Sequence, residues 1–536
     1  MRSLPPLCLC FAAACAVPPS PASPPPETRS GAPELPAIPP RSGALEVDVV
    51  YPAEGASLTA SDSTFVFGSV GSGEARLAIN GAPVEVAPNG AFLAFLPVPT
   101  DGRYQVVATS SGGETARLIR SVELPATLAT QPRGVVSFEA AERMDSVASP
   151  PSEAFSEAAP RAGVVATARA DGVAVGRYAA GSGTPYEWFL PQGVRLEVVE
   201  QRSGQLRVRL APGRSIWLDS ADVRLLPEGT AVPVAYVGAV RLAPAPEWVE
   251  ARLATSQRLP FRVEATERGY EITVFGATSR TNWLYYGPAD PLIESARWEQ
   301  PSDGVYRLRV ETTARPWGWL AEYDSEGTLV VRLRRPPPID PEAPIRGLTI
   351  GVDAGHPPGG AIGPTRLTEA EANLGIARRL AELLEQRGAR VLQIRPDSGA
   401  VALGERPLRA TREGAYLLVS VHNNAFPDGV DPWENNGTSV FYNHGQSREL
   451  AMELQRELLR EFGLRDLGVA RADLALVRPT WMPAALTETM FLMVPRQEAA
   501  LRDPTVRERI ARAHLRGIEA FLRGRAAAES RSGHGS

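Results

Sequence analysis

The sequence predicts a multi-domain protein: all-β modules followed by a C-terminal α/β domain with a mixed or parallel sheet covered by helices. The chain has 536 residues, which is too long for one hydrophobic core. Up to about residue 335, apolar residues alternate with polar ones between turn signals, as expected for β-strands. From about residue 347, short apolar runs alternate with helical patterns, which is typical of an α/β domain.

The first 15 residues have the pattern of a secretory signal. Arg2 precedes a short apolar run that ends in three alanines and Cys15, and this run is too short for a membrane span of about 20 residues. Small residues before a cysteine also resemble a bacterial lipobox, although Ala12 stands where such boxes usually carry leucine. Two outcomes stay open: lipidation of Cys15, which would tether the protein to a membrane, or cleavage after a small residue.

Cysteine usage and charge exclude several classes of function. The three cysteines all lie within the signal, so the rest of the chain has no disulfide framework and no thiolate metal site. All 56 cationic side chains are arginine, which excludes Schiff-base lysines and lysine-containing phosphate loops. The net charge of -5 shows no excess of positive charge of the kind that nucleic-acid-binding proteins carry, so no nucleic-acid partner is expected.

Composition then divides the N-terminal half. Residues 16–44, rich in Pro, Ser and Ala, predict an extended linker. Alternating runs separated by Asn-Gly and Asp-Gly turns predict an immunoglobulin-like β-sandwich over residues 45–125. A second linker is expected at 126–162. Short strands in 163–229 resemble a small barrel of the bacterial Src-homology type.

Residues 230–335 are expected to form a further β-rich unit. Its alternating runs carry several aromatic side chains that have two possible uses. They could form a carbohydrate-stacking face or pack in the core, and core packing is the more frequent use of such residues. The four side chains in question are Trp283, Tyr285, Trp317 and Trp319.

The C-terminal domain is expected to span residues 347–524, after a proline-rich linker at 336–346 and before a disordered tail at 525–536. Its first strand covers 348–352, and its first helix covers 369–387, with Gly388 as the stop. Further strands are expected at 390–394, 416–422, 439–442 and 484–488, and further helices at 403–413, 447–462 and 505–522. Ligands of such sheets gather at the carboxyl ends of the strands.

Two of the five histidines lie at predicted strand ends. His356 follows the first strand and His422 ends a buried one, and a catalytic zinc site adds a carboxylate to such a pair. Glu369 and Glu371 are the two candidates for this carboxylate ligand. Thr368 and Glu371 have the spacing of a capping box, which gives Glu371 a structural task and leaves Glu369 free to face a metal.

Four motifs now occur in the order of a known family: Gly355-His356, Glu369 before Asn373-Leu374, the run 420–425, and the run 486–492. Together they resemble the zinc-dependent N-acetylmuramoyl-L-alanine amidases of the amidase-3 type. The resemblance implies that zinc is the cofactor, with His356, Glu369 and His422 as its ligands and Glu488 as the catalytic carboxylate. By position and pattern, residues 230–335 are similar to the AMIN-type domains that precede such enzymes.

The implied partner is peptidoglycan, cut between N-acetylmuramic acid and L-alanine of the stem peptide during wall turnover or daughter-cell separation. Asn423 and Asn424 are expected to bind substrate, although Asn423 stands where the family usually has alanine. A second departure is the run 357–361, which differs from the family's Gly-Gly-x-Asp-x-Gly, and only 426–436 occupies the place of a site-blocking helix found in some relatives. The expected location is the cell envelope, either periplasmic or as a membrane-anchored lipoprotein, with no obligate oligomer.

Two alternatives stay open at this point. The first is a wall-binding envelope lipoprotein without catalytic activity, whose amidase-like domain is vestigial. The second is a zinc peptidase of similar architecture that cuts a peptide bond.

Overall fold

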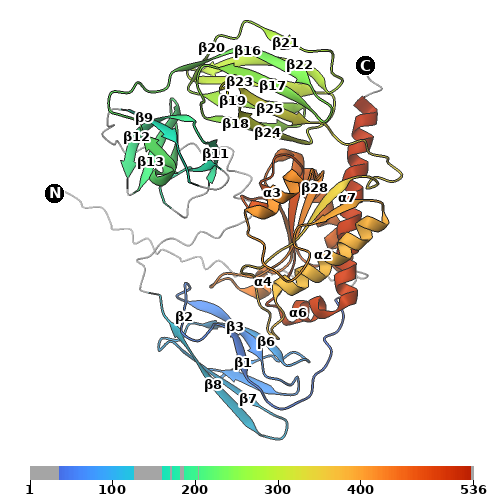
Figure 1. Ribbon diagram of the computed structural model, residues 1–536. Helices are drawn as coiled ribbons and strands as arrows, with labels where there is room; N and C mark the ends of the chain where they lie inside the picture. Colours follow the sequence, from blue (N-terminus) through green and yellow to red (C-terminus); the bar gives the residue numbers. More distant parts are fainter. Residues whose placement is uncertain (1–34, 126–159, 169–171, 182–185, 203, 533–536) are drawn as a thin grey trace, which may run out of the picture.

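Strands build the N-terminal part of the chain, and the α-helices among the described residues lie in the C-terminal domain. The computed structural model describes residues 35–125, 160–168, 172–181, 186–202 and 204–532 (Figure 1). The predicted signal and its Cys15 lie outside these ranges. Within them, no helix has the length and apolarity needed to cross a membrane.

Residues 48–123 form two antiparallel sheets packed around a shared apolar core, with one short parallel pair at an edge. Tyr104 and Phe92 are fully buried between them. The first sheet has the order β1 (Asp48–Tyr51), β3 (Ser63–Ser69), β6 (Ala91–Pro97). The second has the order β2 (Ala56–Ser57), β8 (Thr115–Glu123), β7 (Arg103–Thr109), β4 (Arg76–Ile79), β5 (Ala82–Val84). This unit is called the sandwich below.

The described part of the predicted 16–44 linker is not a free tether. Leu35 is only 7 % exposed because it packs into the core of the C-terminal domain, and its carbonyl accepts a hydrogen bond from Arg496. The backbone of Arg41 pairs with Pro88 and Gly73 of the sandwich. Composition identified a segment that cannot form its own core, but it did not reveal that the segment packs on others.

Two further β units follow. Residues 161–225 form a seven-stranded antiparallel sheet in the order β11 (Tyr186–Pro191), β10 (Val173–Arg177), β14 (Arg214–Asp219), β13 (Gln205–Ala211), β12 (Arg195–Arg202), β9 (Arg161–Val165), β15 (Val223–Leu225). Residues 235–334 form two facing sheets. One contains β20 (Ala277–Ser279), β16 (Ala235–Pro244), β17 (Trp248–Thr255), β25 (Leu329–Arg334), β24 (Gly318–Tyr323) and β21 (Leu284–Tyr286). The other contains β18 (Phe261–Thr266), β19 (Gly269–Phe275), β23 (Val305–Thr312) and β22 (Ile293–Ser302).

The four aromatic side chains of this last unit have different environments. Trp317 is fully buried and its indole donates to the carbonyl of Tyr416, so it joins the unit to the C-terminal domain. Trp319 is partly buried. Trp283 and Tyr285 are 65 % and 43 % exposed and lie side by side, with ring centroids 6.3 Å apart. Core packing therefore describes the two later tryptophans and not the earlier pair.

The C-terminal sheet is mixed. Its order is β27 (Arg390–Gln393), β26 (Thr349–Ala354), β28 (Leu417–Asn424), β31 (Ala484–Phe491), β29 (Thr438–Tyr442), β30 (Asp466–Arg471). All neighbouring pairs are parallel except β29 and β31, which are antiparallel. The three central strands β26, β28 and β31 therefore end at the same edge.

The two faces of this sheet are covered differently. One face packs on the three long helices α2 (Glu369–Gln386), α5 (Arg448–Phe462) and α7 (Pro504–Ser532). The other packs on α3 (Glu405–Arg412), a short 3-10 turn at Ala475–Val477, and Trp248 and Leu320 of the preceding β unit. Helices were expected on both faces, but a neighbouring domain supplies part of the second cover. The remaining helices are α4 (Pro432–Asn435) and α6 (Pro495–Arg502).

Helix α7 corrects the predicted disordered tail at 525–536. The helix continues to Ser532, and Arg525 is only 4 % exposed because its guanidinium donates to the carbonyls of Arg315 and Pro316. A polar, alanine-rich run lacks the apolar stripe that signals a packed helix. Here a contact with another domain supplies the stabilisation.

Candidate metal centre

The candidate site lies at the edge where the central strands end. His356 follows β26 by two residues, and His422 lies near the end of β28. Glu488 on β31 is in register with His422. Glu369 is the first residue of α2, whose N-terminus begins at this edge. Parallel pairing thus collects side chains that are separated by more than 130 positions in the sequence.

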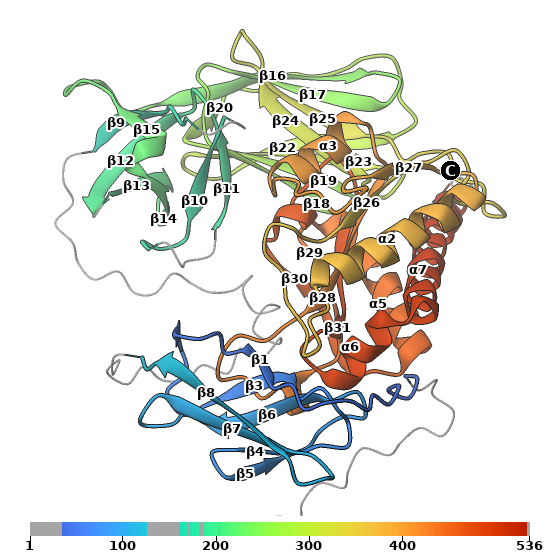
Figure 2. The same cartoon turned by 60° about the horizontal axis from the view of Figure 1, so that its bottom comes forward.

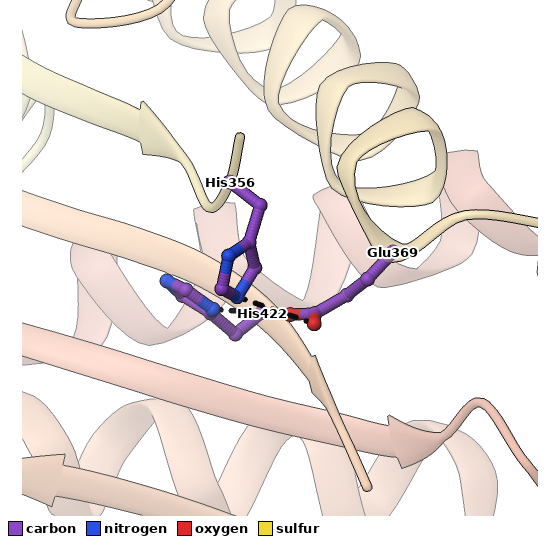
Figure 3. Close-up of side chains that lie close together, drawn as sticks. All are labelled: His356, Glu369 and His422. Carbon is purple, nitrogen blue, oxygen red and sulfur yellow. Dashed lines mark hydrogen bonds and ion pairs between the residues drawn. The ribbon is translucent and has the colours of Figure 1, made fainter. Parts of the chain in front are cut away.

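Figure 3 shows His356 and His422 converging on the carboxylate of Glu369. The Nε2 atom of His356 lies 3.2 Å from one carboxylate oxygen, and Nδ1 of His422 lies 3.1 Å from the other. One ligand atom from each residue lies within 4.8 Å of the other two. Ligands of a tetrahedral zinc ion, at about 2.0–2.2 Å from the metal, lie roughly 3–3.5 Å apart. The donor types and their spacing therefore fit zinc.

The histidine rings are fixed by close backbone contacts. Nδ1 of His356 lies 3.0 Å from the carbonyl of Pro358, so it carries the proton and leaves Nε2 free as a ligand. A Cβ on Gly360 would lie 2.9 Å from the ring of His356. A Cβ on Gly355 would lie 2.3 Å from the ring of His422. Both positions require glycine because the histidine rings occupy the space that a Cβ atom would need.

Glu369, and not Glu371, faces the histidines. The Glu369 side chain is buried and accepts hydrogen bonds from the backbone of Ala361 at 2.9 Å and from the Asn373 amide at 3.2 Å. Burial raises the pKa of Glu369, but the hydrogen bond with His422 and the charges of both histidines outweigh it, so the pKa lies below its ordinary value.

Glu371 lies on the solvent side of the first helical turn. Its backbone N–H donates to the hydroxyl of Thr368, as a helix cap requires. Its carboxylate is 61 % exposed and lies 3.8 Å from Arg507. The Thr368 half of the predicted capping box is therefore present, but the Glu371 carboxylate faces Arg507 and not the helix N-cap; the two glutamates still point apart.

Asn423 requires a correction. It was expected to bind substrate, but its side chain is 1 % exposed and donates to Asn373 at 2.8 Å. Successive side chains of a strand point to opposite faces. Because His422 faces the site, Asn423 points toward α2, where it supports the residue that holds Glu369. Asn424 is half-buried at the strand end, and its contact with substrate stays a prediction.

Glu488 lies beside the three candidate ligands without joining them. Its Oε2 atom is enclosed and has no hydrogen-bond partner among the described residues. Burial, with a smaller contribution from the charge of Glu369, raises its pKa to about 8, although His422 opposes the shift. A buried carboxylate oxygen without a partner is uncommon, and a group that must bind water or substrate accounts for it.

Two buried arginines hold the loop that carries His356. Arg395 donates to the carbonyls of Ala354, Gly355 and Ala370, and so joins this loop to the start of α2. Arg406 donates to the carbonyls of Ala354 and Pro357 and pairs with the buried Asp353. Neither arginine was expected at the site from the sequence. The one local signal concerns Arg395, an arginine that directly follows an apolar strand at Ile394-Arg395.

The two other histidines in the described region lie apart from this cluster. His514 is fully buried on α7, and burial lowers its pKa to about 4. His444 bonds the carbonyl of Arg478, and burial lowers its pKa to about 4 as well. Both therefore stay neutral at physiological pH.

Known proteins match the same part of the chain. Residues 350–520 match the family described as N-acetylmuramoyl-L-alanine amidase. The uncharacterised protein YqiI of Bacillus subtilis is 30 % identical over 184 residues, which is 33 % of this chain and 86 % of YqiI. The N-acetylmuramoyl-L-alanine amidase LytC of the same organism is 32 % identical over 186 residues, 34 % of this chain but only 36 % of LytC.

Among solved structures, the N-acetylmuramoyl-L-alanine amidase AmiC2 of Nostoc punctiforme is 29 % identical. The match covers 33 % of this chain and 97 % of that one, with a TM-score of 0.31. Because residues 350–520 match the family model and YqiI is 30 % identical with 86 % of its length covered, the chain belongs to the N-acetylmuramoyl-L-alanine amidase family.

Proposed function

We propose that this chain is a zinc-dependent hydrolase of peptidoglycan that cleaves the amide between the lactyl group of N-acetylmuramic acid and L-alanine of the stem peptide. The observation that carries the proposal is the convergence of His356, Glu369 and His422 at a strand edge, with the enclosed Glu488 beside them. Two histidines and one carboxylate are a common donor set of catalytic zinc sites, which keep a further position for water.

The residues of this chain take distinct parts in the reaction. When bound, zinc supplies a Lewis acid that polarises the amide carbonyl and makes water more acidic. Asn373, supported by Asn423, keeps the carboxylate of Glu369 turned toward the histidines. In its ionised form, Glu488 accepts a proton as the water oxygen bonds to the carbonyl carbon. It then delivers a proton to the alanine nitrogen as the C–N bond breaks, leaving a carboxylic acid and an amine.

We expect the purified chain to hold one zinc ion per molecule, and His422→Ala to lose most of it, as measured by elemental analysis. The full chain is needed for this measurement, because Leu35 and Trp317 pack into the core of the catalytic domain. His514→Gln is the matched control, since His514 lies outside the cluster of candidate ligands; its ring is buried on α7 and bonds the hydroxyl of Thr487. A folded parent without stoichiometric zinc, or unchanged zinc in His422→Ala, would contradict the assignment.

Digestion of purified sacculi, with mass spectrometry of the products, tests the reaction itself. Amidase activity releases free stem peptides that begin with L-alanine and leaves glycan strands with free lactyl groups. Cleavage within the stem peptide would identify a zinc peptidase instead. Binding to sacculi without any release would identify a wall-binding protein with an inactive domain.

We also propose that Cys15 carries a lipid anchor, on the strength of the Ala-Ala-Ala-Cys sequence. The several acyl chains of a bacterial lipoprotein give stable anchoring, whereas one chain gives only marginal binding. We expect Cys15→Ser to shift the expressed protein from the membrane fraction to the soluble fraction. Equal membrane partitioning of parent and variant would contradict the anchor.

A further inference from the structure

The sandwich packs on the edge of the catalytic sheet at which the candidate metal centre lies. Figures 1 and 2 show it below the catalytic domain, beside α6, while the 235–334 unit lies at the other end. The contact has an apolar centre that both domains share. Its buried members are Phe65, Phe67 and Leu93 of the sandwich and Phe491, Met493 and Val494, which follow or end β31.

Asp428 is the polar centre of this contact. It lies in the segment 425–436, which follows the strand of His422. Its carboxylate accepts hydrogen bonds from the hydroxyl of Tyr51, from the backbone N–H of Thr59 at 2.9 Å and from the hydroxyl of Thr64 at 3.4 Å. All three donors belong to the sandwich. The next residue, Gly429, is packed so closely that an added Cβ would lie 3.2 Å from Ala60.

Arg366 makes a second polar contact with the sandwich. It lies at the tip of the loop 361–368, which connects His356 to Glu369, and has a left-handed backbone with φ of +67°. Its guanidinium forms a bidentate pair with Asp48, with distances of 2.7 and 2.6 Å. The pair is partly exposed, so alone it contributes little to stability.

The loop 361–368 is held from two sides and contacts a candidate ligand. Asp48 holds its tip, while the buried Glu498 on α6 accepts hydrogen bonds from the backbone of Thr365 and Leu367. At its start, the N–H of Ala361 donates to the carboxylate of Glu369 at 2.9 Å. A continuous chain of contacts therefore leads from the sandwich to the metal centre.

We propose that the sandwich is part of the catalytic unit, and that Asp428 and Arg366 are positioning residues through which it fixes the two loops bordering the metal centre. The inference rests on the proposed amidase function. Side chains that hold a reacting geometry need support from a second layer of contacts. In this chain, a separate domain supplies that layer for both loops.

A double-mutant cycle in the full chain tests the Asp428 contact. We expect Asp428→Ala to lower kcat/KM on sacculi roughly ten-fold, because small misplacements near a reacting group cost rate. Tyr51→Phe keeps the aromatic ring and should lower kcat/KM roughly three-fold by the same loss of support. The double variant should be no slower than Asp428→Ala. If Asp428 instead touched substrate, Tyr51→Phe would keep parental activity, which would overturn the inference.

Charge exchange tests the Arg366 contact. Asp48→Arg and Arg366→Asp should each lower kcat/KM, and the double exchange should restore most of it, because the ion pair is rebuilt with reversed polarity. The matched control is the same exchange at the exposed pair of Arg390 and Glu413, at the other end of the sheet, which should leave kcat/KM unchanged. Failure of the double exchange to restore activity would contradict the role of this pair.

Hydrogen exchange on the intact protein separates this inference from the proposed function. In Asp428→Ala the amides of 425–436 should exchange faster, and in Arg366→Asp those of 361–368 should, while zinc content stays at the parental value in both. Tyr104→Phe is the control within the sandwich, since its buried hydroxyl has no hydrogen-bond partner among the described residues. If the loop amides exchange faster but turnover stays at the parental value, this inference is wrong while the proposed function still stands. A parent without amidase activity would overturn the proposed function, and the exchange rates would still decide whether the sandwich holds the loops.

Discussion

Glu488→Gln is expected to fold, to keep its zinc and to lose amidase activity by about 10²- to 10⁴-fold, the usual contribution of a general acid–base group. Glutamine is nearly isosteric with glutamate but cannot accept and return a proton. The side chain lies beside the three candidate ligands and is not one of them, so the metal content should not change. Sacculus digestion and elemental analysis of the same preparation measure both quantities.

A matched control distinguishes lost chemistry from lost structure. Glu457 on α5 has a side chain that is only 5 % exposed and pairs with Arg516 of α7, outside the cluster of candidate ligands. Glu457→Gln should therefore change stability slightly and turnover not at all. Near-parental turnover in Glu488→Gln would place the general base on another residue. Loss of zinc in Glu488→Gln would instead make Glu488 a metal ligand.

Local patterns in the sequence predicted the α/β elements because their causes are local. The apolar run before His422 predicted a buried strand, and the helix that begins at Glu369 stops just before Gly388, which has a φ of +85°. Strand β30 and helix α6 were missed. In β30 every side chain is exposed or partly exposed, so the strand has no alternation of apolar and polar residues. The buried face of α6 includes the polar Gln497 and Glu498, so this helix has no apolar stripe in the sequence.

The residue types of the site could be predicted from the sequence, but the contacts that hold these residues in place could not. Histidines at strand ends and a glutamate after a helix cap identified the residues that the structure brings together. Asn423 was misjudged because its face depends on the pleat of β28, which a motif does not specify. The contacts of Leu35, Asp428 and Arg525 join segments that are distant in the sequence, and composition carries no signal of such pairings.

Glu369→Gln is expected to weaken zinc binding itself, in contrast to Glu488→Gln. The substitution removes a negative charge that lies 3.1–3.2 Å from both histidines and replaces one carboxylate oxygen with an amide that cannot bind a metal. Loss of groups that orient a metal ligand costs about 10- to 100-fold in metal affinity, and loss of a ligand charge should cost at least as much. Titration of the metal-free variant with zinc, in competition with a chelator, measures the change.

Glu371→Gln is the matched control, two positions along the same helix. Its carboxylate is 61 % exposed, and the helix cap uses its backbone N–H, which the substitution keeps. Zinc affinity and turnover should therefore stay close to the parental values. If Glu371→Gln loses the metal while Glu369→Gln keeps it, the two glutamates have exchanged roles. If both keep it, the third ligand lies elsewhere, and the carboxylate of Glu369 serves only to orient the two histidines.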